Sequence, residues 1–238
     1  MNTKVLLSWS SGKDSAWALH RLRQKSGIQV VGLVTTLNES FDRVAMHGVR
    51  KEFVIAQAES IGLPLWPVPL PWPCSNADYE SRMRAVVESA RSQGITAMAF
   101  GDLYLPDIRE YRERQLADTG IAPLFPIWVA PGDTRGLADT MLAAGLRAIL
   151  TCVDSRQLAA DFCGRQFDER LLNELPPGVD PCGENGEFHT FCYDGAIFDH
   201  PISVQTGATV ERDGFCFVEL HPASGDKVTK DHQLLRLR

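Results

Sequence analysis

The strongest chemical signal in the sequence is a short polar loop near the N-terminus, Ser8-Trp9-Ser10-Ser11-Gly12-Lys13-Asp14-Ser15. Its small residues let the main chain approach an anion closely, and free N–H groups at the start of a following helix point toward that anion. The helix dipole and Lys13 add positive charge, and the Ser10 and Ser15 hydroxyls can donate hydrogen bonds to phosphate oxygens. An ordinary capped turn explains one or two of these residues but not the set. The loop therefore predicts a site for a phosphate-bearing anion.

A second polar cluster lies late in the chain, where Glu184, Glu187, His189 and Thr190 share one short glycine-containing stretch. Burying such a cluster costs solvation unless it has a ligand or partners. Glu187 and His189 are two positions apart, so in a strand they share one face, which points toward a cleft if Phe188 faces the core. We expect all four to bind substrate, with Glu187 and His189 as candidate general bases. A polar hairpin is the alternative.

Three other groups of residues could contribute to a site. Gly101-Asp102 ends a predicted strand, on the side where ligands of open α/β sheets bind, although a plain turn is the alternative. The charged run 107–113 is mostly a solvated helix face, from which Tyr111 and Arg112 are the candidates to face a substrate. His47-Gly48 follows the second predicted strand after a loop, where a surface-loop histidine is the alternative.

The segments that must position these residues alternate between short apolar runs and amphipathic ones. Strands are predicted at residues 5–9, 29–37, 96–101, 122–128 and 146–154, and helices at 14–24, 49–62, 76–93, 107–118 and 133–145. The prolines between Pro64 and Pro73 predict an edge strand or an extended loop, because proline cannot donate to a ladder. This alternation predicts an α/β fold with a Rossmann-like, mainly parallel sheet.

The chain changes character after about Asp154, where polar and turn residues dominate up to Asn185. Residues 202–220 then predict two strands joined by a tight hairpin at residues 212–214. We therefore expect two domains. The first, residues 1–130, carries the polar loop, and a smaller C-terminal α+β domain, residues 131–238, carries the second cluster.

The composition excludes several classes of protein. The 238 residues are 44% hydrophobic and 23% charged, which is typical of a folded domain rather than a disordered chain. The formal net charge is −6, so bulk nucleic-acid binding is not expected, although a local anion site is still allowed. The sequence lacks a run of about 18 apolar residues and a signal peptide, so we expect no membrane partner and a cytoplasmic location.

The six cysteines are scattered, and none forms a CxxC pair, so zinc and iron–sulfur spacings are missing. We expect them to be reduced thiols. Cys182 and Cys192 flank the second polar cluster. Either could be a nucleophile, but a small buried thiol is the commoner state.

The polar loop does not match the Walker pattern GxxxxGK[ST], because Leu7 stands where the first glycine belongs and Asp14 follows the lysine. It instead resembles the SGGKDS pyrophosphate-binding loop of the N-type ATP pyrophosphatases. Ser11 replaces the middle glycine of that pattern. Serine tolerates most backbone conformations except those with positive φ, so we expect this departure to be mild.

Three further segments resemble blocks of one branch of that superfamily: MHGVRKE (46–52), AFGDLYLPDIREYRE (99–113) and DPCGENGEFHTFCYDGAIF (180–198). Over nearly its whole length the chain is similar to the diphthine–ammonia ligase family and its bacterial relatives. The resemblance implies a HUP-type α/β fold and an adenylating enzyme. A small-molecule or protein-borne carboxylate would attack the α-phosphorus of ATP and release pyrophosphate. Ammonia would then displace AMP to form an amide.

The resemblance also implies roles for particular residues. The ATP-binding set would be Ser10, Ser11, Gly12, Lys13, Asp14, Ser15, His47, Gly48, Gly101 and Asp102. Lys13 and Mg²⁺ would neutralise phosphate charge, and Asp14 and Asp102 are the candidate Mg²⁺ ligands. Glu187 and His189 would act as a general base or guide ammonia.

Two departures leave the acyl substrate open. The diphthine–ammonia ligases have a block closer to EGGEFETLV, whereas here Asn185 replaces a glycine and His189 replaces an acidic residue. The chain begins Met-Asn, so the cysteine of an N-terminal glutaminase is not expected, and ammonia would come from solution or from a partner. The oligomeric state is also open, with a homodimer as one option.

Two other functions remain as alternatives. A PP-loop enzyme that modifies tRNA usually carries a metal-binding CxxC or a basic RNA surface, and this sequence shows neither. An ATP-binding protein without turnover would carry the same polar loop.

Overall fold

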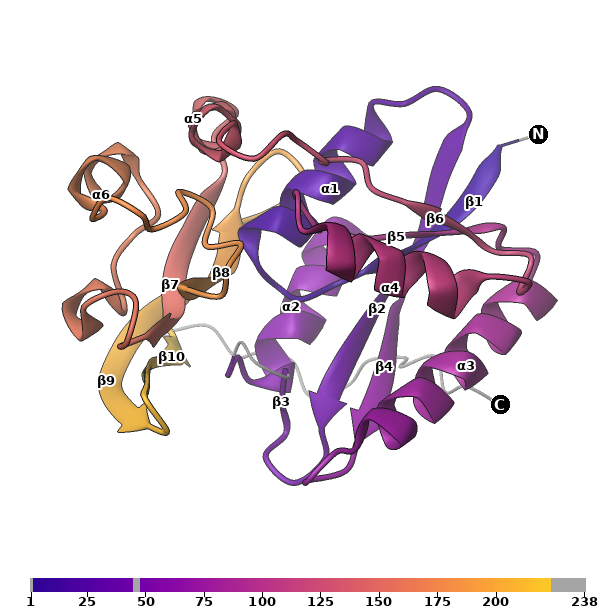
Figure 1. The fold of residues 1–238 in the computed structure, drawn as a ribbon, viewed down its shortest axis with the longest axis horizontal. Helices are drawn as coiled ribbons and strands as arrows, with labels where there is room; N and C mark the ends of the chain where they lie inside the picture. The colour runs from indigo at the N-terminus through magenta and orange to yellow at the C-terminus, as the bar shows by residue number, and fades with distance from the viewer. Residues whose placement is uncertain (1, 45–47, 224–238) are drawn as a thin grey trace.

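The computed structural model describes residues 2–44 and 48–223, which form two sheets (Figure 1). The first sheet has the order β3-β2-β1-β5-β6, with β4 paired to β2. Its strands are β1 (Thr3–Ser8), β2 (Ile28–Asn38), β3 (Arg43–Val44), β4 (Leu65–Leu70), β5 (Ala97–Ala99) and β6 (Ala122–Leu124). Every pair is parallel except β2 with β3. The predicted Rossmann-like sheet is confirmed.

Helices cover both faces of this sheet: α1 (Lys13–Arg23), α2 (Lys51–Ile61), α3 (Asn76–Ser92) and α4 (Pro106–Leu116). Side chains alternate along β1, so Val5 and Leu7 join the core with α1 and α2, and Leu6 joins the core with α3 and the end of α4. A sheet buried on both faces explains why its strands are continuous apolar runs in the sequence.

Local signals set several of the element ends. β4 lies at an edge of the sheet, as its prolines predict. Helix α2 stops at Gly62, which has a φ of +73°, and α3 starts after Ser75, whose hydroxyl accepts a hydrogen bond from the Asp78 N–H at 3.1 Å. The strand predicted at 122–128 ends early, at Leu124, because Pro126 cannot extend the ladder.

The second sheet is antiparallel, in the order β8-β7-β10-β9. Its strands are β7 (Arg147–Asp154), β8 (Phe188–Asp194), β9 (Val204–Arg212) and β10 (Phe215–Pro222), accompanied by α5 (Thr134–Ala143), η1 (Ala160–Phe162) and α6 (Glu169–Glu174). The predicted hairpin joins β9 to β10, with positive φ at Asp213 and Gly214. The sequence did not predict η1 or α6. Helix α6 is only six residues long and is stabilised by burying Leu171 and Leu172, which is a tertiary effect.

The two sheets share one hydrophobic core. One hydrophobic cluster contains residues of both, and Phe53 of α2 meets Phe191 of β8 edge to face, with ring centroids 5.6 Å apart. The predicted boundary between residues 130 and 131 stays a prediction. All six cysteines lie in the described part of the chain and are free thiols, as expected. Within residues 2–44 and 48–223, none of the helices combines the length and the apolarity that a membrane span requires.

Candidate active site

The polar loop joins β1 to α1, and its main chain is unusual at Ser11. Ser11 is fully buried and has a φ of +71°, in the left-handed region. For a residue other than glycine this conformation costs about 1 kcal/mol or more. The expectation that serine is a mild substitute at this position is therefore wrong, because the loop requires the positive φ that glycine adopts freely.

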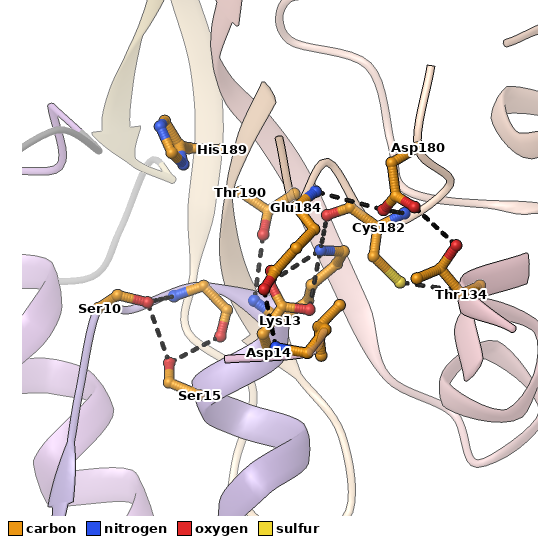
Figure 2. A network of polar contacts seen from close by, with 12 residues as sticks. Ser10, Lys13, Asp14, Ser15, Thr134, Asp180, Cys182, Glu184, His189 and Thr190 are labelled. Atoms are coloured by element: carbon orange, nitrogen blue, oxygen red, sulfur yellow. Dashed lines mark hydrogen bonds and ion pairs between the residues drawn. The ribbon is translucent and has the colours of Figure 1, made fainter. Parts of the chain in front are cut away.

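The polar groups around the loop fit a chain of phosphates. The Ser10 and Ser15 hydroxyl oxygens lie 3.3 Å apart, and the Gly12 N–H donates to Ser10 Oγ at 3.4 Å (Figure 2). The buried Ser11 hydroxyl has no hydrogen-bond partner among the described residues. A Cβ on Gly101 would lie 3.0 Å from the Ser15 nitrogen, so glycine leaves space beside the first turn of α1. Hydroxyls and main-chain N–H groups at a helix N-terminus suit the phosphates of ATP.

Lys13 is buried, with 1% of its surface exposed, and points toward the C-terminal part of the chain. Its ammonium lies 2.9 Å from both oxygens of Asp14, donates to the Cys182 carbonyl, and sits 5.5 Å from the ring centroids of Phe167 and Phe188. Burial opposes the charged form, but the interactions with Asp14, Cys182 and Glu184 together outweigh burial and raise the pKa of Lys13. The raised pKa favours the charged form of Lys13.

Strand β8 holds the start of α1 from the other side. The Lys13 N–H donates to Thr190 Oγ1 at 3.1 Å, and the Cys192 N–H donates to the Ser11 carbonyl at 2.9 Å. The structure therefore brings the two polar motifs of the sequence together in one site.

The loop before β8 is held by its own acidic residues. Glu187 is buried, and its carboxylate accepts hydrogen bonds from the Asp180 N–H at 2.8 Å and from Asn185 at 2.9 and 3.0 Å. Asp180 accepts from Cys182, Glu184 and the Thr134 hydroxyl. These contacts make Glu187 a support of the loop, and its predicted role as a general base stays a prediction.

Glu184 is an acidic residue of this loop that bonds the main chain of the other half of the site (Figure 2). Its Oε1 accepts the Leu103 N–H at 2.8 Å, just beyond Asp102. Burial, with repulsion from Asp14 and Asp102, raises the pKa of Glu184 to about 7, even though the Leu103 N–H opposes the shift. A carboxyl group that titrates near neutral pH is suited to accept or donate a proton.

Asp102 and Arg112 meet as an ion pair, with Arg112 Nε 3.3 Å from Asp102 Oδ2. Arg112 also donates to the Tyr79 hydroxyl at 3.4 Å and lies over the Phe100 ring. Burial raises the pKa of Asp102, although Arg112 opposes the shift. Tyr111 is half-buried beside Arg112. The substrate role of Tyr111 and Arg112 and the metal role of Asp102 stay predictions.

Three predicted site residues are not placed beside Lys13 and Glu184. The His189 side chain points away from Lys13 and Glu184 in Figure 2. Burial and the charge of Lys13 lower the pKa of His189 to about 4, so its ring is neutral at pH 7. Gly48 faces β10, where an added Cβ would lie 3.1 Å from Phe217. His47 lies outside the described residues.

The two flanking cysteines have the properties of buried thiols. Cys182 Sγ donates to the Thr134 carbonyl at 3.4 Å and Cys192 Sγ to the Asp194 carbonyl at 3.6 Å. Burial raises the pKa of both thiols. Since the thiolate is the nucleophilic form, this environment favours the structural alternative for both.

Two residues of the site escaped the sequence-based prediction. Asp180 organises the loop before β8, and Gln57 of α2 bonds to the Ser11 carbonyl at 3.0 Å. Gln57 did carry a signal, because it falls four residues after Phe53 and four before Ile61, on the buried stripe of an amphipathic helix. A glutamine on such a stripe must have buried partners.

Comparisons with known proteins identify the family of this chain. The family model described as diphthamide synthase N-terminal domain matches residues 1–123, and the one described as diphthamide synthase C-terminal domain matches residues 133–221. The diphthine–ammonia ligase of Danio rerio is 27% identical over 226 residues, covering 84% of this chain and 86% of that protein. The diphthine–ammonia ligase of Bos taurus is 26% identical over 246 residues, covering 89% and 90%. The predicted resemblance is confirmed: the chain belongs to the diphthamide synthase family, whose relatives include these diphthine–ammonia ligases.

Proposed function

We propose that this chain is an ATP-dependent ligase that adenylates a substrate carboxylate and joins it to ammonia. The carboxylate oxygen attacks the α-phosphorus of ATP and pyrophosphate leaves. Ammonia then attacks the acyl carbon, AMP leaves, and the nitrogen loses a proton as the amide forms. The names of the two relatives support the ligase class and the use of ammonia.

One observation carries this proposal: the polar loop and the loop before β8 contact each other. Lys13 donates to the Cys182 carbonyl, and Glu184 bonds the main chain beside Asp102. A nucleotide held at the start of α1 would therefore lie beside an acidic group with a pKa of about 7. Binding of ATP alone would not need the second loop.

The residues of the loop supply positive charge and hydrogen bonds to the phosphates. The Ser10 and Ser15 hydroxyls and the N–H groups of the first turn of α1 would hold them, and Lys13 would neutralise charge on the leaving pyrophosphate. Mg²⁺ would supply further neutralisation. Mg²⁺ usually binds through one or two carboxylates together with the substrate phosphates. Asp14 and Asp102 would provide those carboxylates.

Glu184 is our candidate for the proton acceptor. Near neutral pH part of its population is ionised, and in that form it can take the proton that the nitrogen loses. Glu187 is a weaker candidate, because its oxygens already accept three hydrogen bonds from the loop. His189 points away from the cluster.

The acyl substrate of this chain is proposed only as a class: a carboxylate on a small molecule or on a protein. Asn185 and His189 mark where it departs from the diphthine–ammonia ligase pattern. Asn185 bonds Glu187 and accepts from the Tyr104 hydroxyl at 3.2 Å, so this departure lies within the loop that carries Glu184.

The test is exchange of labelled pyrophosphate into ATP, with Mg²⁺ and a panel of carboxylates that includes diphthine-bearing protein. Exchange that depends on one carboxylate, with AMP as the nucleotide product once ammonia is added, is expected. ADP and phosphate as products would overturn the proposal. ATP binding without exchange for any carboxylate would instead favour a nucleotide-binding protein without turnover.

A further inference from the structure

Gln57 lies in the middle of α2, and its side chain is fully buried. Its Oε1 accepts from the Trp9 indole N–H at 2.9 Å. Its Nε2 donates to the carbonyl oxygens of Ser11 at 3.0 Å and of Cys192 at 2.6 Å. One side chain thus joins the polar loop, at Trp9 and Ser11, to strand β8.

The three partners dictate which side chain fits. An indole N–H can only donate and a carbonyl can only accept, so position 57 must offer one acceptor and two donors in a buried space. A primary amide meets this requirement. A glutamate lacks the two donors, and a methionine of similar length lacks all three groups.

The Ser11 carbonyl is held from two sides, by Gln57 Nε2 and by the Cys192 N–H. In a trans peptide the following N–H points opposite to the carbonyl. Holding the Ser11 carbonyl therefore aims the Gly12 N–H toward Ser10 Oγ, beside the Ser15 hydroxyl (Figure 2). Ser11 is also in the left-handed region, which serine leaves unless its surroundings hold it there.

We propose that Gln57 is a positioning residue for ATP. It holds Ser11 in the left-handed conformation, which this chain needs because it has serine where the SGGKDS pattern has glycine, and so keeps the Gly12 N–H aimed at the phosphates. The inference rests on the proposed function, since ATP is the ligand whose site it supports. The inference adds a residue of α2 to the proposed ATP site, although α2 is not adjacent in sequence to the polar loop.

The proposal is tested by measuring the Kd of ATP with Mg²⁺ by titration calorimetry. Gln57→Met is expected to raise Kd about tenfold in the natural chain, because two carbonyls lose a donor. In a Ser11→Gly background the same change is expected to raise Kd less than about threefold, because glycine adopts positive φ without support. If Gln57→Met raised the Kd of ATP by the same factor in the natural chain and in the Ser11→Gly chain, the proposal would be overturned.

Ser60→Ala is the matched control on the same helix. Ser60 is also fully buried, and it exchanges hydrogen bonds with the main chain of His200 at 2.6 and 3.1 Å, far along the chain from the polar loop. The Ser60→Ala variant should unfold at a lower urea concentration but change the Kd of ATP by less than about twofold. A loss of ATP affinity equal to that of Gln57→Met would show general destabilisation and overturn the inference.

Gln57→Glu serves if Gln57→Met does not fold, because it keeps the acceptor for Trp9 and removes the amide donors. Its effect on the Kd of ATP is likewise measured in the natural chain and in the Ser11→Gly chain. A natural chain that binds no ATP would overturn the proposed function and this inference together. A chain that binds ATP but shows equal factors would overturn this inference alone.

Discussion

The Lys13 N–H donates to Thr190 Oγ1 at 3.1 Å, across 177 positions of the chain. This hydrogen bond joins the first turn of α1 to strand β8 of the second sheet. It satisfies one of the N–H groups that a helix leaves without an internal partner. The C-terminal part of the chain therefore helps to hold the start of α1, where we propose that the phosphates bind.

Thr190→Val keeps the shape of this buried side chain and removes its acceptor. The Lys13 N–H would lose its partner, so the free energy of unfolding is expected to fall by about 1–3 kcal/mol. Urea unfolding measures this change. Thr209→Val on the exposed face of β9 is the control and should change stability by less than about 0.5 kcal/mol. Equal effects of the two variants would contradict the role of Thr190.

Lys13→Met is expected to lower kcat/KM for ATP-dependent amide formation by at least about 100-fold, because the buried cation of the proposed ATP site is lost. Lys13→Arg should not retain activity, since only 1% of the residue is exposed, the ammonium lies 5.5 Å from the ring centroids of Phe167 and Phe188, and a guanidinium is larger than an ammonium. Lys25→Met, on the exposed turn after α1, is the control. Full activity of Lys13→Arg would refute this picture of the site.

Glu184→Gln is expected to lower kcat by about 100-fold if Glu184 accepts a proton. The natural enzyme should also lose activity as the pH falls through about 7, because the carboxyl group becomes protonated. The variant should lack that acidic limb in its profile of kcat against pH. An unchanged limb would assign the titration to another group.

The raised pKa of Glu184 also predicts an effect on stability. The folded chain holds the proton up to pH about 7, whereas an unfolded glutamate releases it near 4.5. The free energy of unfolding should therefore fall, relative to that of Glu184→Gln, as the pH rises from about 4.5 to 7. Urea unfolding of both proteins across this interval measures the difference. Parallel curves would mean that Glu184 is not buried in the folded state.

Gly183→Ala should destabilise the loop before β8 for two reasons. Gly183 has a φ of +71°, and an added Cβ would lie 2.7 Å from the Phe188 carbonyl oxygen. Gly186→Ala is a matched control, because Gly186 also has a positive φ but has open space around it. We expect a loss of about 1 kcal/mol for Gly186→Ala and clearly more for Gly183→Ala in urea unfolding. Equal losses would show that the Phe188 contact does not matter.

Much of the fold was predictable because its signals are local. Alternating apolar runs, the Ser75 cap and Gly62 gave element positions, and the prolines of β4 indicated an edge strand. The elements that the sequence did not predict depend on tertiary contacts. Helix α6 forms because Leu171 and Leu172 are buried against the second part of the chain.

By itself, the sequence determined the α/β fold, the polar loop with Lys13, and the family, because these depend on residue types and spacings along the chain. Only the tertiary structure decided which acidic side chain reaches the main chain beside Asp102 and how Ser11 is held. Glu184 bonds the main chain beside Asp102 while Glu187 supports its own loop, and Gln57 joins Trp9 and Ser11 of the polar loop to Cys192 of β8. The reason is physical: burial and long-range hydrogen bonds, which raise the pKa of Glu184 and hold Ser11 at positive φ, arise only when residues far apart in the chain are packed together.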